Sequence, residues 1–157
     1  MAEYAHEQLQ TSGARVKFID LREFDLPFCD GEDTYAHPAV KQLSAMVESA
    51  QGILVATPIY NYNVNAVLKN MVELTGRYWT DKVVGFMCSA GGKTSYMSIL
   101  SLANSLMLDF HSIIIPRFVY INGSQSEKPV LEDDIKERID KLNQELFRFV
   151  RGLKSGA

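Results

Sequence analysis

Unbroken apolar runs and helical repeats alternate along this chain. The apolar residues 53–56 lie between Gly52 and Pro58, residues 83–88 form a second run, and a third begins at residues 113–115. Short apolar runs bounded by turn residues indicate strands buried on both faces, which are typical of parallel sheets. A short β-rich run from Arg15 to Leu21 predicts a further strand ahead of these, followed by an acidic loop.

Helical spacing of apolar residues fills the segments between the runs. Helices are predicted over residues 3–10, from His37 to near Gly52, over residues 66–75 and over residues 96–109. A last helix carries an apolar stripe formed by Leu131, Ile135, Ile139, Leu142, Leu146 and Phe149. Its opposite face places Glu132 before Lys136, and Asp134 before Arg138, at the favourable i to i+4 spacing.

Strands that alternate with helices predict right-handed crossovers and an α/β fold. The expected architecture is a doubly wound parallel sheet in three layers, α/β/α. A length of 157 residues suits one domain, so a single domain is predicted over residues 1–157.

Composition and charge remove several classes of function. A net charge of −3, without a run of basic residues, argues against nucleic acid as a partner. No apolar stretch is long enough to cross a bilayer, and the first ten residues lack the features of a signal peptide. Cys29 and Cys88 are too few for a disulfide framework or a structural zinc site, so both are predicted to be free thiols of a cytoplasmic protein without a metal.

Two segments stand out where the buried runs end, since ligands of open parallel sheets bind outside the carboxyl ends of strands. The first is Thr57-Pro58-Ile59-Tyr60-Asn61-Tyr62-Asn63, which offers flat rings and amide donors suited to a planar heteroaromatic ligand. The second is Ser89-Ala90-Gly91-Gly92-Lys93-Thr94-Ser95, where glycines permit close backbone approach before a helix. The alternative is a pair of ordinary turns, because Pro, Asn, Ser and Gly are common turn residues.

A phosphate-loop motif does not explain the second segment. Gly92-Lys93-Thr94 follows a strand and precedes a helix, but Met87 occupies the place where that motif needs its first glycine. Binding of a nucleoside triphosphate is therefore not expected.

Thr57-Pro58-Ile59-Tyr60-Asn61, followed by Val67-Leu68-Lys69-Asn70, resembles the signature of the NADPH-dependent FMN reductase family. In that flavodoxin-like family a Pro-x-Tyr-Asn loop leads into a helix carrying Leu-Lys-Asn. The segment Ser89 to Gly92 is similar to the family's second flavin loop, and the similarity runs from about Ala2 to Val150.

The resemblance implies the cofactors and the residues that contact them. One side of the isoalloxazine ring of FMN would be lined by Pro58, Ile59, Tyr60, Asn61 and Asn63. The polar edge of the ring would be contacted by Ser89, Ala90, Gly91 and Gly92. NADPH or NADH would reduce the flavin, which would pass electrons to a quinone, an azo compound, a metal ion or free flavin. No catalytic acid or base is implied.

The family begins with a strand and a Gly-Ser-x-Arg-x-x-Ser loop that holds the FMN phosphate, and the given sequence opens with what resembles the following helix. In the flavodoxin-like strand order that first strand lies between two others, so two edges would be left open. Three repairs are possible: the strand near Val16 shifts to pair with Ile53–Ala56, a second chain fills the edge, or the start is misassigned.

Several other residues have simpler interpretations. His6, His37 and His111 are scattered and are predicted to be structural or solvated, and Met71, Met87, Met97 and Met107 are predicted to fill the core. Residues 77–79 (Arg-Tyr-Trp) are candidates for stacking against a partner subunit of a homodimer or homotetramer, or against a flavin, with burial in the core as the alternative.

Three functions remain open at this point. The first is an FMN-dependent NAD(P)H oxidoreductase. The second is a flavodoxin-like binding or oligomerisation module that has lost flavin, and the third is an electron carrier, which the modest charge of −3 disfavours.

Overall fold

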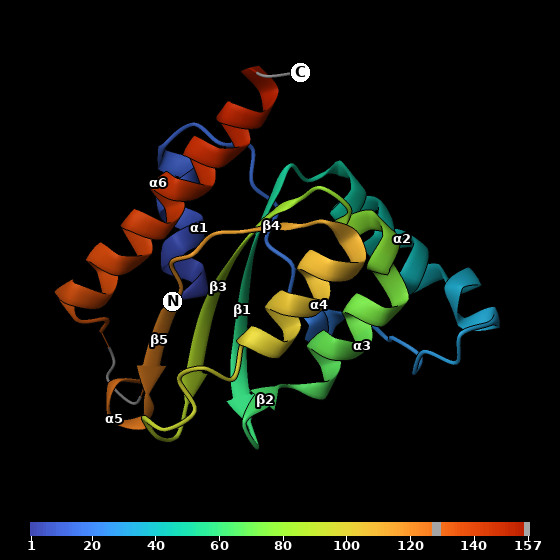
Figure 1. The fold of residues 1–157 in the computed structure, drawn as a ribbon, viewed down its shortest axis with the longest axis horizontal. Coiled ribbons are helices and arrows are strands. Elements are labelled where there is room, and N and C mark those ends of the chain that lie inside the picture. Colours follow the sequence, from blue (N-terminus) through green and yellow to red (C-terminus); the bar gives the residue numbers. More distant parts are fainter. Residues whose placement is uncertain (127–129, 156–157) are drawn as a thin grey trace.

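Helices cover both faces of a central sheet, in the predicted three-layer α/β/α arrangement (Figure 1). The structure is a computed structural model and describes residues 1–126 and 130–155. Its strands are β1 (Gly52–Tyr60), β2 (Asn63–Val64), β3 (Val83–Ala90), β4 (Ile113–Ile114) and β5 (Val119–Asn122).

The order of the strands follows a path β2-β1-β3-β4, with β5 also pairing with β3. β1 and β3 run parallel from Gly52 opposite Val83 to Pro58 opposite Ser89. β4 and β5 pair in parallel with the other edge of β3, while β2 is antiparallel to the end of β1. The parallel pairing predicted for the two apolar runs is therefore confirmed.

The helices largely follow the predicted periodicity. They are α1 (Ala2–Thr11), α2 (Pro38–Ser49), α3 (Ala66–Thr75), α4 (Leu100–Phe110), the short α5 (Gly123–Ser126) and α6 (Asp133–Ser155). Short 3₁₀ turns occur at Leu21–Glu23, Asp33–Ala36 and Gly76–Trp79. α3 has the predicted bounds because Asn65 caps it, its Oδ1 accepting a hydrogen bond from the N–H of Leu68 at 2.9 Å.

Each face of the sheet has its own apolar cluster. One cluster combines β1 and β3 with α2, α3 and α4, and includes Leu43, Leu68 and Leu106. The other joins α1 and α6 to the opposite face of the sheet, and includes Leu9 and Ile139. The α6 stripe is confirmed, since Ile135, Ile139, Leu142 and Leu146 are buried.

The strand predicted from Arg15 to Leu21 is wrong. Residues 14–20 form neither helix nor strand, and Leu21 begins a 3₁₀ turn. Val16 packs against the α1 and α6 cluster, whereas Ile19 packs against the cluster on the other face. The segment therefore passes around an edge of the sheet, because its apolar side chains are drawn to opposite faces.

Three aromatic and methionine predictions also need correction. Met71 and Met87 are core residues as predicted, but the side chains of Met97 and Met107 are exposed on the α4 side. Trp79, a candidate for a subunit contact, is 1% exposed and donates its Nε1–H to Thr75 Oγ1 at 3.0 Å. Its ring fills the core because the 3₁₀ turn after α3 directs it inward.

Two further findings concern the cysteines and the question of a membrane crossing. Cys29 and Cys88 are free thiols, as predicted. Within the described residues, no helix combines the length and apolar character that a membrane crossing requires.

Candidate functional site

The two segments singled out in the sequence leave the sheet side by side. β1 and β3 are adjacent and parallel, and Pro58 lies directly opposite Ser89. The hydroxyl oxygens of Tyr62 and Thr94 lie 3.0 Å apart and join the two segments by a hydrogen bond. We call this place, formed by residues 57–63 and 89–95, the strand-tip site.

The first half of the strand-tip site is a tight hairpin, where a loop was predicted. β1 continues to Tyr60, which pairs with Asn63, so only Asn61 and Tyr62 form the turn. Both have positive φ angles, 50° and 61°, which is the conformation of a two-residue type I′ turn. The turn fixes the rings of Tyr60 and Tyr62, which are 62% and 67% exposed, outside the sheet.

Asn63 connects the hairpin to α4. Its Oδ1 accepts hydrogen bonds from the N–H of Val64 at 2.8 Å and from Ser101 Oγ at 3.2 Å. Because its carbonyl oxygen is engaged twice, the side-chain NH₂ is the group that remains for a ligand.

The second half of the site has an open backbone. Gly91 and Gly92 are exposed, and no atom lies within 4 Å of the position where a side chain on either would begin. At Gly123 a side chain would begin 2.9 Å from the carbonyl oxygen of Gly91, so a glycine there permits close approach of the chain after β5.

Tyr120 of β5 positions this second half, a role that the sequence did not reveal. Its hydroxyl donates a hydrogen bond to the carbonyl of Gly92 and lies 2.9 Å from Ser95 Oγ. The ring of Tyr96 packs on Tyr120, with centroids 5.5 Å apart. The contacts span at least 24 positions of sequence, so no local pattern could have signalled them.

A hollow of about 430 Å³ opens beside the hairpin. It is lined by Tyr60, Asn61, Asn63, Val64, Asn65, Ala66 and Lys69. Three of the predicted flavin contacts thus border it, while Ser89 to Gly92 lie outside its lining. Lys69 Nζ is paired with Glu73 Oε1 at 2.5 Å, so the charge at this border is already balanced.

The Leu-Lys-Asn part of the motif has a structural role here. Asn70 donates from Nδ2 to the carbonyl of Pro27 at 2.9 Å, and its Oδ1 accepts from the N–H of Cys29 at 2.9 Å. These two bonds hold residues 27–29 against α3. Asn70 therefore fixes a neighbouring loop, while Lys69 alone of the three borders the hollow.

The histidines serve local structure, as predicted. His37 caps α2, its Nδ1 accepting from the N–H of Ala39 at 3.3 Å, and the ring of His6 contacts the ring of Phe18. His111 ends α4 with a φ of 53°. No group of three or more His, Cys, Asp or Glu side chains able to hold a metal ion occurs among residues 1–126 and 130–155.

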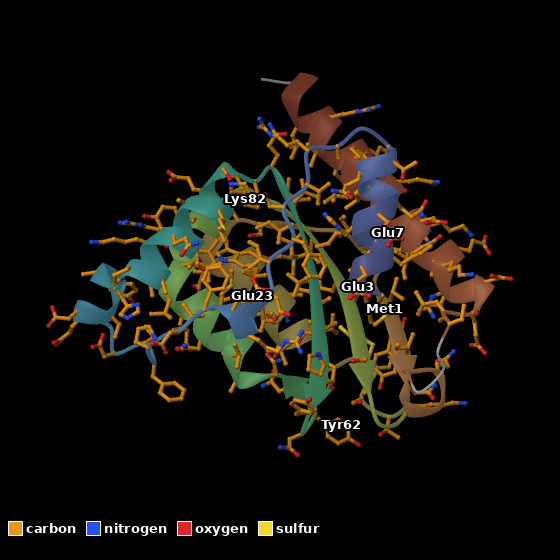
Figure 2. The ribbon with its side chains drawn as sticks, turned by 180° about the vertical axis from the view of Figure 1, so that it is seen from behind. Met1, Glu3, Glu7, Glu23, Tyr62 and Lys82 are labelled. Atoms are coloured by element: carbon orange, nitrogen blue, oxygen red, sulfur yellow. The ribbon has the colours of Figure 1, made fainter. Side chains whose placement is uncertain are left out.

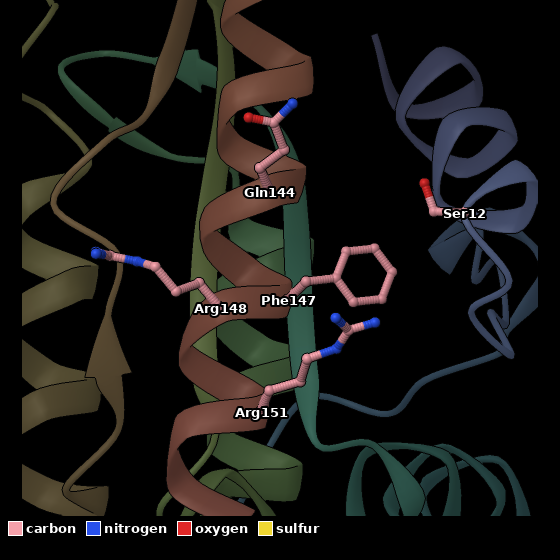
Figure 3. Close-up of a pocket in the computed structure, with 5 residues that line it drawn as sticks. All are labelled: Ser12, Gln144, Phe147, Arg148 and Arg151. Atoms are coloured by element: carbon pink, nitrogen blue, oxygen red, sulfur yellow. The ribbon is translucent and has the colours of Figure 1, made fainter.

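A second hollow, of about 420 Å³, lies far from the strand tips between the end of α1 and α6. Figure 3 shows Phe147 and Arg151 extending from α6 toward Ser12, while Arg148 points away. Arg148 forms an ion pair with Glu145 at 2.6 Å, and the guanidinium of Arg151 lies 5.6 Å from the ring of Phe147.

Comparisons with known proteins agree with the resemblance read from the motifs. An NAD(P)H-dependent FAD/FMN reductase of Geobacillus thermodenitrificans is 27% identical over 146 residues, covering 90% of this chain and 78% of that protein. An NADPH:quinone oxidoreductase of Arabidopsis thaliana is 29% identical over 154 residues, covering 90% of this chain and 78% of that protein.

The fold comparison confirms a flavodoxin-like architecture. A flavodoxin, WrbA-like protein from Agrobacterium tumefaciens superposes with a TM-score of 0.58 at 14% identity, covering 69% of this chain and 71% of that chain. The sequence profile described as NADPH-dependent FMN reductase matches residues 1–126. The chain therefore belongs to the NADPH-dependent FMN reductase family, whose members are oxidoreductases that use FMN and NAD(P)H.

Proposed function

We propose that this chain is an FMN-dependent NAD(P)H oxidoreductase that passes electrons through flavin to a small acceptor, namely a quinone, an azo compound, a metal ion or free flavin. The observation that carries the proposal is the junction of the two segments, with Pro58 opposite Ser89 and Tyr62 bonded to Thr94. FMN, when bound, supplies the hydride and electron transfer chemistry, while the protein supplies position and electrostatics.

The residues of the strand-tip site fit the ring of FMN. Pro58, Ile59, Tyr60, Asn61 and Asn63 would line one side of it, and Ser89, Ala90, Gly91 and Gly92 would meet its polar edge. The open space beside Gly91 and Gly92 supports this assignment, because a ring edge can approach their backbone N–H groups closely. These nine residues are uncharged, so a neutral heteroaromatic ring meets no unpaired charge among them.

The exposure of the site bears on the acceptor. Tyr60 and Tyr62 stand largely in solvent, and no described helix covers the hairpin. A shallow site of this kind admits acceptors of different shape, which supports small diffusible molecules over a dedicated protein partner. The quinone activity named for the Arabidopsis thaliana relative favours a quinone among them.

A cytoplasmic homodimer or homotetramer is the form that we propose for the enzyme. The exposed side of α4 and the turns before it carries four large apolar side chains, Met97, Leu100, Met107 and Leu108, exposed by 57%, 40%, 40% and 79%, among polar residues and the charged Lys93 and Asp109. It adjoins the strand-tip site through Ser101, and exposed apolar side chains gathered on one face suit burial against a second copy of the same face. Light scattering should show an oligomer that Leu108→Glu dissociates. A monomeric wild type would refute this arrangement.

The test of function is turnover by purified protein. NADPH and NADH oxidation is measured with added FMN and, in turn, a benzoquinone, an azo dye and a ferric chelate. Flavin-dependent turnover with at least one acceptor is expected. A protein that neither quenches FMN fluorescence nor oxidises either nicotinamide would instead favour the binding or oligomerisation module.

A further inference from the structure

Tyr120 differs from the other tyrosines near the strand-tip site because it is buried. It is 7% exposed, whereas Tyr60 and Tyr62 lie largely in solvent. It belongs to β5, where it lies opposite Cys88 of β3, and its side chain reaches the turn that follows β3. A buried hydroxyl needs hydrogen-bond partners, so the partners of Tyr120 indicate what its side chain does.

The hydroxyl of Tyr120 has one proton, which it donates to the carbonyl oxygen of Gly92. The hydroxyl oxygen also lies 2.9 Å from Ser95 Oγ. Because the proton of Tyr120 is already used, Ser95 is the donor in this second bond. Tyr120 thus joins the two ends of the turn from Gly92 to Ser95, and both of its bonds have a defined direction.

The bond to Gly92 orients one peptide group. A trans peptide is planar, and its C=O and N–H point in opposite directions. No peptide bond of the described residues is cis. Since the carbonyl of Gly92 points toward Tyr120, the N–H of Lys93 points away from it. This N–H has no hydrogen-bond partner among residues 1–126 and 130–155.

The preceding peptide has a similar orientation. The carbonyl oxygen of Gly91 lies 2.9 Å from the position where a side chain on Gly123 would begin, and its carbonyl carbon lies 3.6 Å from that position. This carbonyl therefore points toward the chain after β5, and the N–H of Gly92 points away from it. Two successive N–H groups, those of Gly92 and Lys93, are thus turned away from β5.

The side away from β5 is the side of the hairpin. β3 lies between β5 and β1, whose end forms the hairpin. Figure 2 shows Tyr62 of the hairpin at the end of the sheet where β3 and β5 also end. Thr94, directly after Lys93, is bonded to Tyr62 at 3.0 Å. The two N–H groups and the hairpin therefore border the same space, and successive N–H groups of this kind bind negatively charged oxygens.

We propose that Tyr120 is a positioning residue for the flavin: it orients the N–H groups of Gly92 and Lys93 so that the site binds reduced FMN more tightly than a site without this bond. The inference rests on the proposed function and adds the N–H of Lys93 to the nine contacts predicted from the sequence. Reduction adds negative charge to the polar edge of the ring, and N–H donors stabilise negative charge. Tyr120 exchanges no proton with the ring, because its proton stays in the bond to Gly92.

Tyr120→Phe tests the role of the hydroxyl, because it keeps the buried ring. Affinity for oxidised FMN should fall about threefold and affinity for reduced FMN about tenfold or more, since a bond to a charged acceptor is the stronger one. Fluorescence titration gives the first affinity, and the midpoint potential of bound FMN then gives the second through the thermodynamic cycle. Equal weakening of both forms would overturn the inference, because a general defect of the turn affects both forms alike.

Tyr96→Phe is the matched control. The ring of Tyr96 packs on Tyr120 with centroids 5.5 Å apart, but its hydroxyl makes no hydrogen bond within the described part of the chain. Removing this hydroxyl should change either affinity less than about twofold. A loss equal to that of Tyr120→Phe would show that aromatic packing, and not the bond to Gly92, is responsible, and it would contradict the inference.

A measurement without flavin tests the geometry itself. In ¹³C,¹⁵N-labelled protein, the carbonyl resonance of Gly92 and the amide resonance of Lys93 should move in Tyr120→Phe and stay in place in Tyr96→Phe. If neither moves in Tyr120→Phe, this side chain does not hold the peptide and the inference fails even where FMN binds. A wild-type protein that shows these shifts but binds no FMN would refute the proposed function, and with it the assignment of the two N–H groups to the ring.

A second variant is available should Tyr120→Phe not fold. Ser95→Ala removes the bond that orients the Tyr120 hydroxyl and leaves the tyrosine in place. Affinity for reduced FMN should again fall more than affinity for oxidised FMN, by a factor of about two or more. Equal changes in the two affinities would contradict the inference.

Discussion

Two hollows described above have nearly equal volume, and we propose that the one beside the hairpin borders the cofactor site. The hollow beside the hairpin measures about 430 Å³ and the groove between α1 and α6 about 420 Å³. Two polar side chains of the groove already have partners: Ser12 Oγ donates to the carbonyl of Gln8 at 2.8 Å, and Arg148 pairs with Glu145. At the strand tips, by contrast, a backbone turn holds Asn61 and exposes it.

The comparison shows that volume does not identify a site. Groups fixed by the backbone at the carboxyl ends of parallel strands present the same geometry to every ligand that arrives. Long side chains on one helix surface, such as those of Arg148 and Arg151, can interact with residues of the same helix and can adopt many rotamers. We therefore expect substitutions at the strand tips to weaken FMN binding, and substitutions in the groove to have little effect on it.

The largest expected difference concerns the two thiols. Burial raises the pKa of the Cys88 thiol, directly below the strand-tip site, to about 12, whereas Cys29 lies in a half-buried loop. At pH 8 the raised pKa lowers the thiolate fraction of Cys88 on the order of a thousandfold relative to an unshifted thiol, so Cys88 should react with a disulfide reagent far more slowly than the more accessible Cys29. One thiol should be titrated in native protein and two in denaturant. Rapid reaction of both thiols in native protein would show that Cys88 is accessible to the reagent.

The raised pKa of the Cys88 thiol also affects the stability of the protein at alkaline pH. A pKa that is raised in the folded state means that the folded protein keeps its proton where the unfolded chain loses it. Stability from this thiol is therefore present below the unfolded pKa and declines as the pH rises from about 9 toward 12. Cys88→Ala should flatten this decline in denaturant titrations between pH 8 and 10.5, and an unaltered decline would contradict the assignment to this thiol.

Next in size is the effect of filling the open backbone. Gly91→Val places a branched side chain where no atom now lies within 4 Å, so the protein itself should fold normally. FMN affinity should fall about a hundredfold or more, since the ring edge and the new side chain compete for one space. Fluorescence titration measures this loss. Gly152→Val, at a similarly open glycine on α6, is the control, and equal affinities of the two variants would contradict the site.

A smaller effect is expected from the hairpin amide. Asn61→Gly keeps a residue that tolerates a φ of 50° and removes only the side chain. Loss of one hydrogen bond to the ring should weaken FMN about fivefold to tenfold, with an unchanged melting temperature. An affinity equal to wild type would show that the Asn61 side chain does not contact the ligand.

The smallest effect is expected in the groove. A double substitution, Arg148→Ala with Arg151→Ala, removes the guanidinium groups that lie over the rings of Phe149 and Phe147, and it should change FMN affinity and NADPH turnover less than twofold. Both side chains project from α6 on the far side of the sheet from α3 and α4 (Figures 1 and 3). A tenfold loss of turnover would move the functional site to this groove.

Local sequence patterns correctly predicted those helices and strands whose signal lies within a single segment. α3 begins after a capping Asn65, and β3 is an apolar run whose burial needs no distant partner to be recognised. The strand expected at Arg15–Leu21 failed because pairing needs a partner strand, and no described strand pairs with this segment. The β propensity of this segment describes only how well its side chains suit the surface of a sheet.

The site was predictable in its position but not in its shape. Two apolar runs with unusual loops after them were enough to place residues 58–63 beside residues 89–92, because parallel strands end at the same edge. The hairpin was missed since Asn61-Tyr62 lacks the glycine that usually marks such a turn. Tyr120 was missed because its bonds to Gly92 and Ser95 join segments that are distant in sequence.

One titration tests the central claim most directly. FMN is added to ¹⁵N-labelled protein, and the backbone amide shifts are followed residue by residue. Shifts confined to Ile59–Asn63 and Ser89–Ser95, with residues 144–151 of the groove unmoved, are the predicted result. Shifts centred on the groove, or no shift anywhere at saturating FMN, would contradict the assignment of the flavin ring to the strand tips.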